Sequence, residues 1–114
     1  MIRKPSSPLE KQIQAAVIDR WRVLGVPGSL IAAVPNAGAL GQPGLTAGIF
    51  DLICIGPSFV GFLELKREGG KLSAHQEAFR LLLLRNGIPH AVAYGLDEAI
   101  IALEFWGIVR RAAA

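Results

Sequence analysis

The stretch 48–66 constrains the fold of this chain more than any other. Two apolar runs flank the tripeptide 56–58, which is Gly-Pro-Ser. Short apolar runs bounded by Gly and Pro are typical of buried strands joined by a tight turn. With the turn centred on 57–58, residues at equal distances from it face each other across the hairpin. Asp51 is therefore expected opposite Glu64.

The same hairpin gathers charge at one of its ends. Directly opposite residues have Cβ atoms about 5 Å apart, and the two-residue period of a strand puts Lys66 on the same face as Glu64. Charge in an otherwise apolar environment is costly unless it is paired or binds a metal. Asp51, Glu64 and Lys66 are therefore either a functional site or a strand-end cluster of salt bridges in solvent.

The length of 114 residues fits one domain with a single buried core, and we assign this domain to 1–114. The hydrophobic fraction is 52% and the charged fraction only 18%, which suggests a self-association surface. The net charge is +3, from twelve Lys and Arg against nine Asp and Glu. If several of the acids bind a metal, the remaining surface is basic and suits a polyanionic partner.

The only cysteine is Cys54, so an internal disulfide and a cysteine-based zinc site are excluded. Its apolar neighbours favour a small buried side chain over a thiol nucleophile assisted by His75 or His90. The N-terminus lacks the apolar run of a signal peptide, and no stretch approaches the roughly 18 apolar residues of a membrane helix. We expect a cytoplasmic protein of bacterial or phage type that does not contact membranes.

Helix and strand signals alternate along the chain and predict an α/β fold, with a mixed sheet and helices on both faces. A helix between the last two strands allows those strands to be parallel. The expected elements are a helix from 8 to 24, a strand in 29–34, the hairpin in 49–66, a helix from 74 to 86, a strand in 88–94 and a helix from 97 to 106.

Three of these helices have recognisable starts. Ser7 with Glu10, and Ser73 with Gln76, form capping boxes, in which each side chain hydrogen-bonds the other residue's backbone N–H. Asp97 is expected to cap the last helix. A side chain that folds back onto its own helix start is not available to a metal. Capping and function are therefore competing interpretations of Glu10 and Gln76.

The segment 35–48 differs from the rest of the chain. It holds four glycines and two prolines and almost no large apolar side chain. A structureless stretch of this length in a compact domain is usually functional or disordered. Because it leads into Asp51, we expect it to lie beside the charged end of the hairpin, as a functional loop or as a plain surface connection.

Asp51, followed by Glu64 and Lys66, is the pattern that metal-dependent phosphodiester cleavage requires. Carboxylates bind Mg²⁺ or Mn²⁺, which neutralises the phosphate and lowers the pKa of a bound water. The lysine can orient that water, help to deprotonate it, or stabilise charge on the phosphorus. Glu10, on a neighbouring helix, is the candidate third carboxylate.

The residues around this pattern resemble the VRR-NUC (virus-type replication-repair nuclease) branch of the PD-(D/E)XK nucleases. The resemblance covers about residues 9–94 and is most specific from 64 to 76. Phe50 departs from the family's Pro-Asp motif, at a position that we interpret as backbone scaffolding. The segments that carry the resemblance are Glu10, Pro35-Asn36 with the glycine-rich loop, 48–51, 62–66 and 70–76.

The resemblance implies a restriction-endonuclease-like core, αβββαβ followed by a C-terminal helix, and a divalent-metal-dependent DNA endonuclease. It implies Mg²⁺ or Mn²⁺ as cofactor, and a catalytic set that is similar to the family's. In this sequence the metal ligands would be Asp51, Glu64, the backbone carbonyl of Leu65 and Glu10, and the catalytic residues Asp51, Glu64, Lys66, Glu10 and Gln76.

Stand-alone members of the resembled family are homodimers that resolve branched DNA such as Holliday junctions. The last helix, with Phe105 and Trp106, is expected to form part of a dimer interface or to pack in the core. Two alternatives stay open: a nuclease subunit acting on flaps, ends or damaged DNA with a partner, and a catalytically idle DNA-binding module. DNA contacts that position without reading bases are expected from Lys71, Arg67, Arg80, Lys11 and Asn36, with Arg3 and Lys4.

Overall fold

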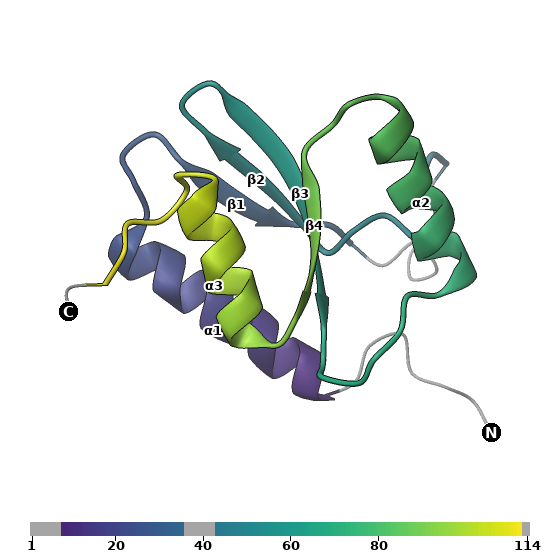
Figure 1. Ribbon diagram of the computed structural model, residues 1–114, viewed down its shortest axis with the longest axis horizontal. Helices are drawn as coiled ribbons and strands as arrows, with labels where there is room; N and C mark the ends of the chain where they lie inside the picture. Colours follow the sequence, from purple (N-terminus) through teal and green to yellow (C-terminus); the bar gives the residue numbers. More distant parts are fainter. Residues whose placement is uncertain (1–7, 36–42, 113–114) are drawn as a thin grey trace.

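The structure is a computed structural model that describes residues 8–35 and 43–112. Within these ranges the elements follow the predicted order of helix, three strands, helix, strand and helix (Figure 1). Their bounds are α1 Pro8–Leu24, β1 Leu30–Ala33, β2 Leu52–Gly56, β3 Phe59–Lys66, α2 Ala74–Arg85, β4 His90–Tyr94 and α3 Leu96–Phe105. The predicted α/β fold is confirmed.

The four strands form one mixed sheet in the order β1-β2-β3-β4, with β4 parallel to β3 and the other neighbours antiparallel. In the β2–β3 hairpin Leu52 pairs with Leu63. This register is the one expected for a turn centred on 57–58. Continued by one residue, it sets Asp51, which immediately precedes β2, opposite Glu64.

Helices α1 and α3 cover one face of the sheet and α2 covers the other (Figure 1). The face under α1 and α3 holds the main core. Burial of Cys54 in this core raises the pKa of its thiol to about 12, which argues against a thiolate nucleophile. The core residues are Ile13, Val17, Ile31, Leu52, Cys54, Leu63, Leu65, Ala93, Ala99, Ile100, Leu103, Ile108 and Val109.

On the opposite face, α2 is anchored by aromatic rings. Phe79 meets Phe50 and Phe62 edge-on, with ring centroids 5.2 and 5.4 Å apart. Edge-to-face contacts of this kind add to the gain from burial. The side chain of Phe50 is fully buried, so this position does more than shape the backbone. It links the segment before β2 to α2.

The start of α3 differs from the expectation, because Asp97 does not cap it. The N-cap is Gly95, with φ of 98° and no side-chain cap. Its N–H donates to the carbonyl of Lys66 at 2.8 Å, so the chain turns directly off the sheet edge in a backbone conformation that favours glycine. Asp97 lies in the first turn, where a negative charge still suits the helix dipole.

The two aromatic residues at the end of α3, Phe105 and Trp106, were expected either in a dimer interface or in the core, and they lie in different environments. Trp106 packs against Phe59, with ring centroids 5.0 Å apart. Phe105 is 87% exposed, so it is not part of the core. Neither α3 nor any other helix within the described ranges is long and apolar enough to cross a membrane.

Candidate active site

Two hydrogen bonds hold the carboxylates of Asp51 and Glu64 at the point where the β2–β3 ladder ends. The N–H of Asp51 donates to Oε1 of Glu64 at 3.1 Å, and the N–H of Leu65 donates to Oδ2 of Asp51 at 2.9 Å. Each carboxylate therefore accepts from the backbone of the other's segment. The expected proximity of these two acids is confirmed.

Lys66 completes a buried charged cluster. Its Nζ lies 3.7 Å from Oε2 of Glu64, as the two-residue period of β3 requires. Glu64 is 1% exposed and Lys66 8%, and they are the two buried charged residues in the described part of the chain. Removing charge from water costs several kcal/mol per ion unless partners compensate. A salt-bridge cluster in solvent is therefore the wrong description of this site.

The electrostatics of the pair favour binding of a cation. Burial, and then the charge of Asp51, raise the pKa of Glu64 to about 8, although Lys66 acts in the opposite direction. Burial also raises the pKa of Asp51. The site therefore holds two carboxylates, one buried and one half-buried, beside a single ammonium group. Full ionisation of both acids would leave an excess of negative charge. Hard oxygen ligands of this kind are those that Mg²⁺ and Mn²⁺ prefer, so the donor set fits a divalent cation.

The backbone carbonyl of Leu65 is directed to the edge of β3 on which Asp51 lies. In a strand, the N–H and C=O of one residue point to the same edge. The N–H of Leu65 points to Asp51, whereas the carbonyl of the next residue, Lys66, points to β4 and accepts from Gly95. The Leu65 carbonyl is thus directed to the side on which the Asp51 carboxylate lies, as a further metal ligand requires.

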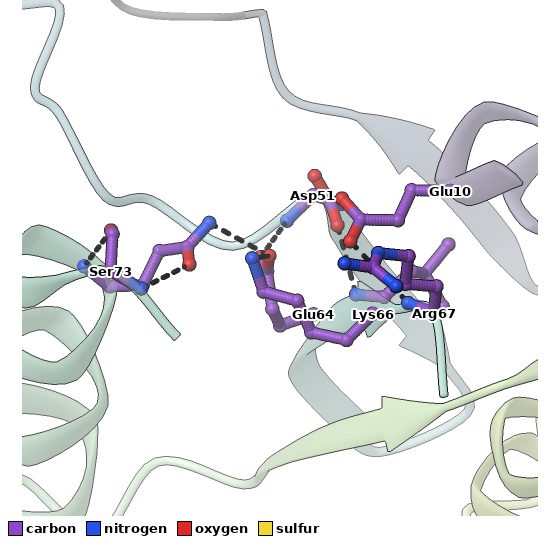
Figure 2. A network of polar contacts seen from close by, with 8 residues as sticks. Glu10, Asp51, Glu64, Lys66, Arg67 and Ser73 are labelled. Carbon is purple, nitrogen blue, oxygen red and sulfur yellow. Dashed lines mark hydrogen bonds and ion pairs between the residues drawn. The ribbon is translucent and has the colours of Figure 1, made fainter. Parts of the chain in front are cut away.

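Glu10 reaches this cluster from α1 (Figure 2). Its Oε2 accepts a hydrogen bond from the N–H of Arg67 at 3.4 Å, and its charge contributes to the raised pKa of Asp51. Its carboxylate is therefore directed to the end of β3, while Ser7, its expected capping partner, lies outside the described residues. Over 8–35 and 43–112, no three His, Cys, Asp or Glu side chains are grouped closely enough to hold a metal ion.

Gln76 uses its side-chain amide for two purposes at once. Its Oε1 accepts from the N–H of Ser73 at 2.9 Å, and its Nε2 donates to Oε2 of Glu64 at 2.9 Å. The Ser73 hydroxyl accepts from the N–H of Gln76, which completes the capping box. An amide offers donors and an acceptor on different atoms. The expectation that capping and a role in the site exclude each other is therefore wrong for this residue.

The predicted DNA-contacting residues differ in exposure and in their interactions. Lys11, Arg67 and Lys71 are exposed, on α1, directly after β3 and shortly before α2. The guanidinium of Arg80 instead hydrogen-bonds Glu77 on its own helix, with Nε 2.8 Å from Oε1. Asn36 lies outside the described residues, as do Arg3 and Lys4. Contact of these residues with DNA stays a prediction.

One residue of the site has no role in the sequence-based expectations. Gly48 has φ of 89° and contacts the backbone of the first turn of α2. Its position in the resembling segment 48–51 is a signal that it matters. The sequence does not show why glycine is needed there, because the contact is made to a helix that begins 26 residues later.

Comparison with known proteins shows the fold. No protein-family model matches the chain, and no curated protein matches it. A solved structure described as a VRR_NUC domain superposes with a TM-score of 0.67 at 22% identity, covering 88% of this chain and 99% of that one. A VRR_NUC domain protein superposes with a TM-score of 0.74 at 23% identity, covering 89% of each chain. The resemblance predicted from the sequence is confirmed as a likeness of fold.

Proposed function

We propose that this protein is a divalent-metal-dependent endonuclease that hydrolyses phosphodiester bonds in DNA. The observation that carries the proposal is the pair of Asp51 and the buried Glu64, each carboxylate accepting a backbone N–H from the other's segment, with Lys66 beside it. The fold likeness to VRR_NUC domains supports a nuclease domain. The assignment of 1–114 to one such domain belongs to the same proposal.

The cofactor in this proposal is Mg²⁺ or Mn²⁺. Asp51, Glu64 and the carbonyl of Leu65 would hold the cation, and Glu10 would reach it or its waters. When bound, the cation would neutralise phosphate charge and lower the pKa of the attacking water. The raised pKa values of Asp51 and Glu64 support this ligand set, because added positive charge relieves the cost of ionising both.

The remaining residues of the site orient and stabilise. Lys66 would hold the attacking water by a hydrogen bond or stabilise negative charge on the phosphoryl group, because its ammonium is confined beside Glu64. Gln76 donates to Glu64 and so fixes the rotation of that carboxylate. Hydrogen bonds of this kind orient metal ligands and tune their affinity.

The substrate in this proposal is branched DNA such as a four-way junction, cut by a homodimer. Exposed Lys11, Arg67 and Lys71 suit phosphate contacts that do not depend on sequence. A two-fold symmetric dimer presents two equivalent sites to two strands. The exposed pair Ile101 and Phe105, one turn apart on α3, offers apolar surface for the interface.

A panel of substrates tests this function. A four-way junction, a flap and a linear duplex are each incubated with Mg²⁺ or Mn²⁺ and the wild type, Lys66→Ala or Lys71→Ala. We expect preferential cleavage of the junction, its loss in Lys66→Ala, and in Lys71→Ala only weaker binding with a smaller dependence on salt.

The alternatives give different results in the same panel. Cleavage of flaps or ends alone would favour a nuclease subunit that takes its specificity from a partner. No cleavage of any substrate would favour an idle DNA-binding module. If Lys66→Ala cuts as fast as the wild type, the assigned mechanism is wrong.

A further inference from the structure

The first turn of α2 rests directly on Gly48. A Cβ on this residue would lie 2.3 Å from both the backbone carbon and the backbone oxygen of His75, and 2.8 Å from the backbone nitrogen of Gln76. Separations under 3.0 Å essentially never occur for a real Cβ. The atoms that it would meet belong to a helix backbone and cannot rotate away. Any side chain at this position must therefore push α2 and the loop apart.

The contact lies between the two groups that hold Glu64. On one side of it, three residues further along the chain, the N–H of Asp51 donates to Oε1 of Glu64. On the other side, the side chain of Gln76 donates to Oε2 of the same carboxylate. Each oxygen of Glu64 is thus held from one of the two segments that meet at Gly48.

We propose that Gly48 is a positioning residue of the site. Because it lacks a side chain, the segment before β2 and the first turn of α2 touch, and this contact sets the placement of the Gln76 amide on Glu64. The expected loss of metal affinity when Gly48 is replaced rests on the proposed function. The expected change in the Gln76–Glu64 hydrogen bond is independent of that function.

A second glycine in the same loop provides the matched control. Gly44 has φ of 91°, close to the 89° of Gly48, but a Cβ on Gly44 would have no heavy atom within 4 Å. Alanine at either position incurs a similar backbone strain, because both φ values are unfavourable for residues with a side chain. Only at Gly48 does it also displace α2. The difference between Gly48→Ala and Gly44→Ala therefore isolates the contact.

The test compares these two variants in the metal-free protein and with Mn²⁺. In NMR spectra, the side-chain amide of Gln76 should shift and exchange faster with solvent in Gly48→Ala, and remain as in the wild type in Gly44→Ala. By calorimetry, the Mn²⁺ affinity should fall about 10- to 100-fold in Gly48→Ala. Gln76→Ala should lower the Mn²⁺ affinity by about as much. The double variant Gly48→Ala/Gln76→Ala should bind Mn²⁺ no more weakly than either single variant. Gly44→Ala should stay within about twofold of the wild type.

Several results would overturn the proposal. One is a Gln76 amide and an Mn²⁺ affinity in Gly48→Ala that match Gly44→Ala, and another is additive losses in the double variant. If Gly48→Ala does not fold, NOESY spectra of the wild type replace it, because the contact places the Hα protons of Gly48 beside the backbone N–H of Gln76. Absence of cross-peaks between these protons also contradicts the proposal. A wild type that neither binds Mn²⁺ nor cuts DNA refutes the proposed function, while the amide spectra still decide the role of Gly48.

Discussion

At the C-terminal end of β3 the two faces are equally buried but are built from opposite chemistry. Leu63 and Leu65 point into the core under α1 and α3 and are 0% and 1% exposed. Glu64 and Lys66 point to the other face and are 1% and 8% exposed. Burial alone therefore does not identify a core position. What distinguishes the faces is what covers them.

The difference arises from the way in which α2 lies on its face. The body of the helix packs through Phe79 on Phe62 and Phe50, whereas its first turn approaches the end of β3. That turn supplies the Gln76 amide, and the neighbouring segment supplies the N–H of Asp51. Polar groups therefore reach Glu64 from both sides, which lowers the cost of burying it.

The core face is expected to give the largest effect on stability. Leu63→Ala should lower the free energy of unfolding by about 2–5 kcal/mol, because it leaves a cavity in a closely packed core. Urea unfolding measures this loss. DNA cleavage per folded molecule should stay close to that of the wild type. Loss of cleavage without loss of stability would contradict the separation of the two faces.

Lys66→Met tests the opposite face by making it apolar while keeping the buried stem of the side chain. Cleavage should fall about 10²- to 10³-fold, as when one group that stabilises transition-state charge is removed. Stability should fall, and most at alkaline pH, because removing one partner of a buried ion pair leaves the ionised Glu64 without its counter-charge. Leu65→Met on the core face is the matched control and should keep its activity. Cleavage by Lys66→Met at the rate of the wild type would contradict the role assigned to the lysine.

The third prediction concerns pH. The folded metal-free protein holds a proton on Glu64 up to about pH 8, against an ordinary pKa of 4.5. The folded state therefore binds more protons than the unfolded state between these values, and stability falls as pH rises from about 4.5 to about 8.

The groups that face Glu64 are Asp51, Lys66 and the Gln76 amide. Glu64→Gln should remove most of this pH-dependent loss of stability, about 1 kcal/mol or more in the free energy of unfolding. A smaller pH dependence, caused by Asp51, should remain. Thermal unfolding in a chelating buffer measures it. An equal slope in wild type and Glu64→Gln would show that Glu64 is not the group that titrates.

Much of this arrangement was predictable because it depends on local rules. The turn at 57–58 fixed the register, and the register set Asp51 opposite Glu64, since pairing in a hairpin follows from its turn. The box of Ser73 and Gln76 likewise needed only four consecutive residues.

The rest depends on contacts between distant segments. The packing of Phe50 on α2, the second hydrogen bond of Gln76 and the contact at Gly48 are set by how α2 docks, which no local pattern encodes. Asp97 failed as a cap for the same reason, because Gly95 is held by the carbonyl of Lys66 on another strand.

The smallest effect on the monomer is expected at the surface of α3. Phe105→Ser should change the free energy of unfolding by no more than about 0.5 kcal/mol, because the ring is 87% exposed and surface substitutions of this kind have small effects. In sedimentation experiments the same variant should shift the proposed homodimer towards monomer. An unchanged dimer would remove Phe105 from the interface.

The most direct test of the charged face as a metal centre is Mn²⁺ binding by calorimetry. We predict that the wild type binds Mn²⁺ with a Kd below about 1 mM and releases a proton, with affinity that increases as pH rises through about 8, since the cation must displace the proton on Glu64. Asp51→Asn and Glu64→Gln should each abolish this binding. Binding that is absent in the wild type, or equal in all three proteins, would contradict the account.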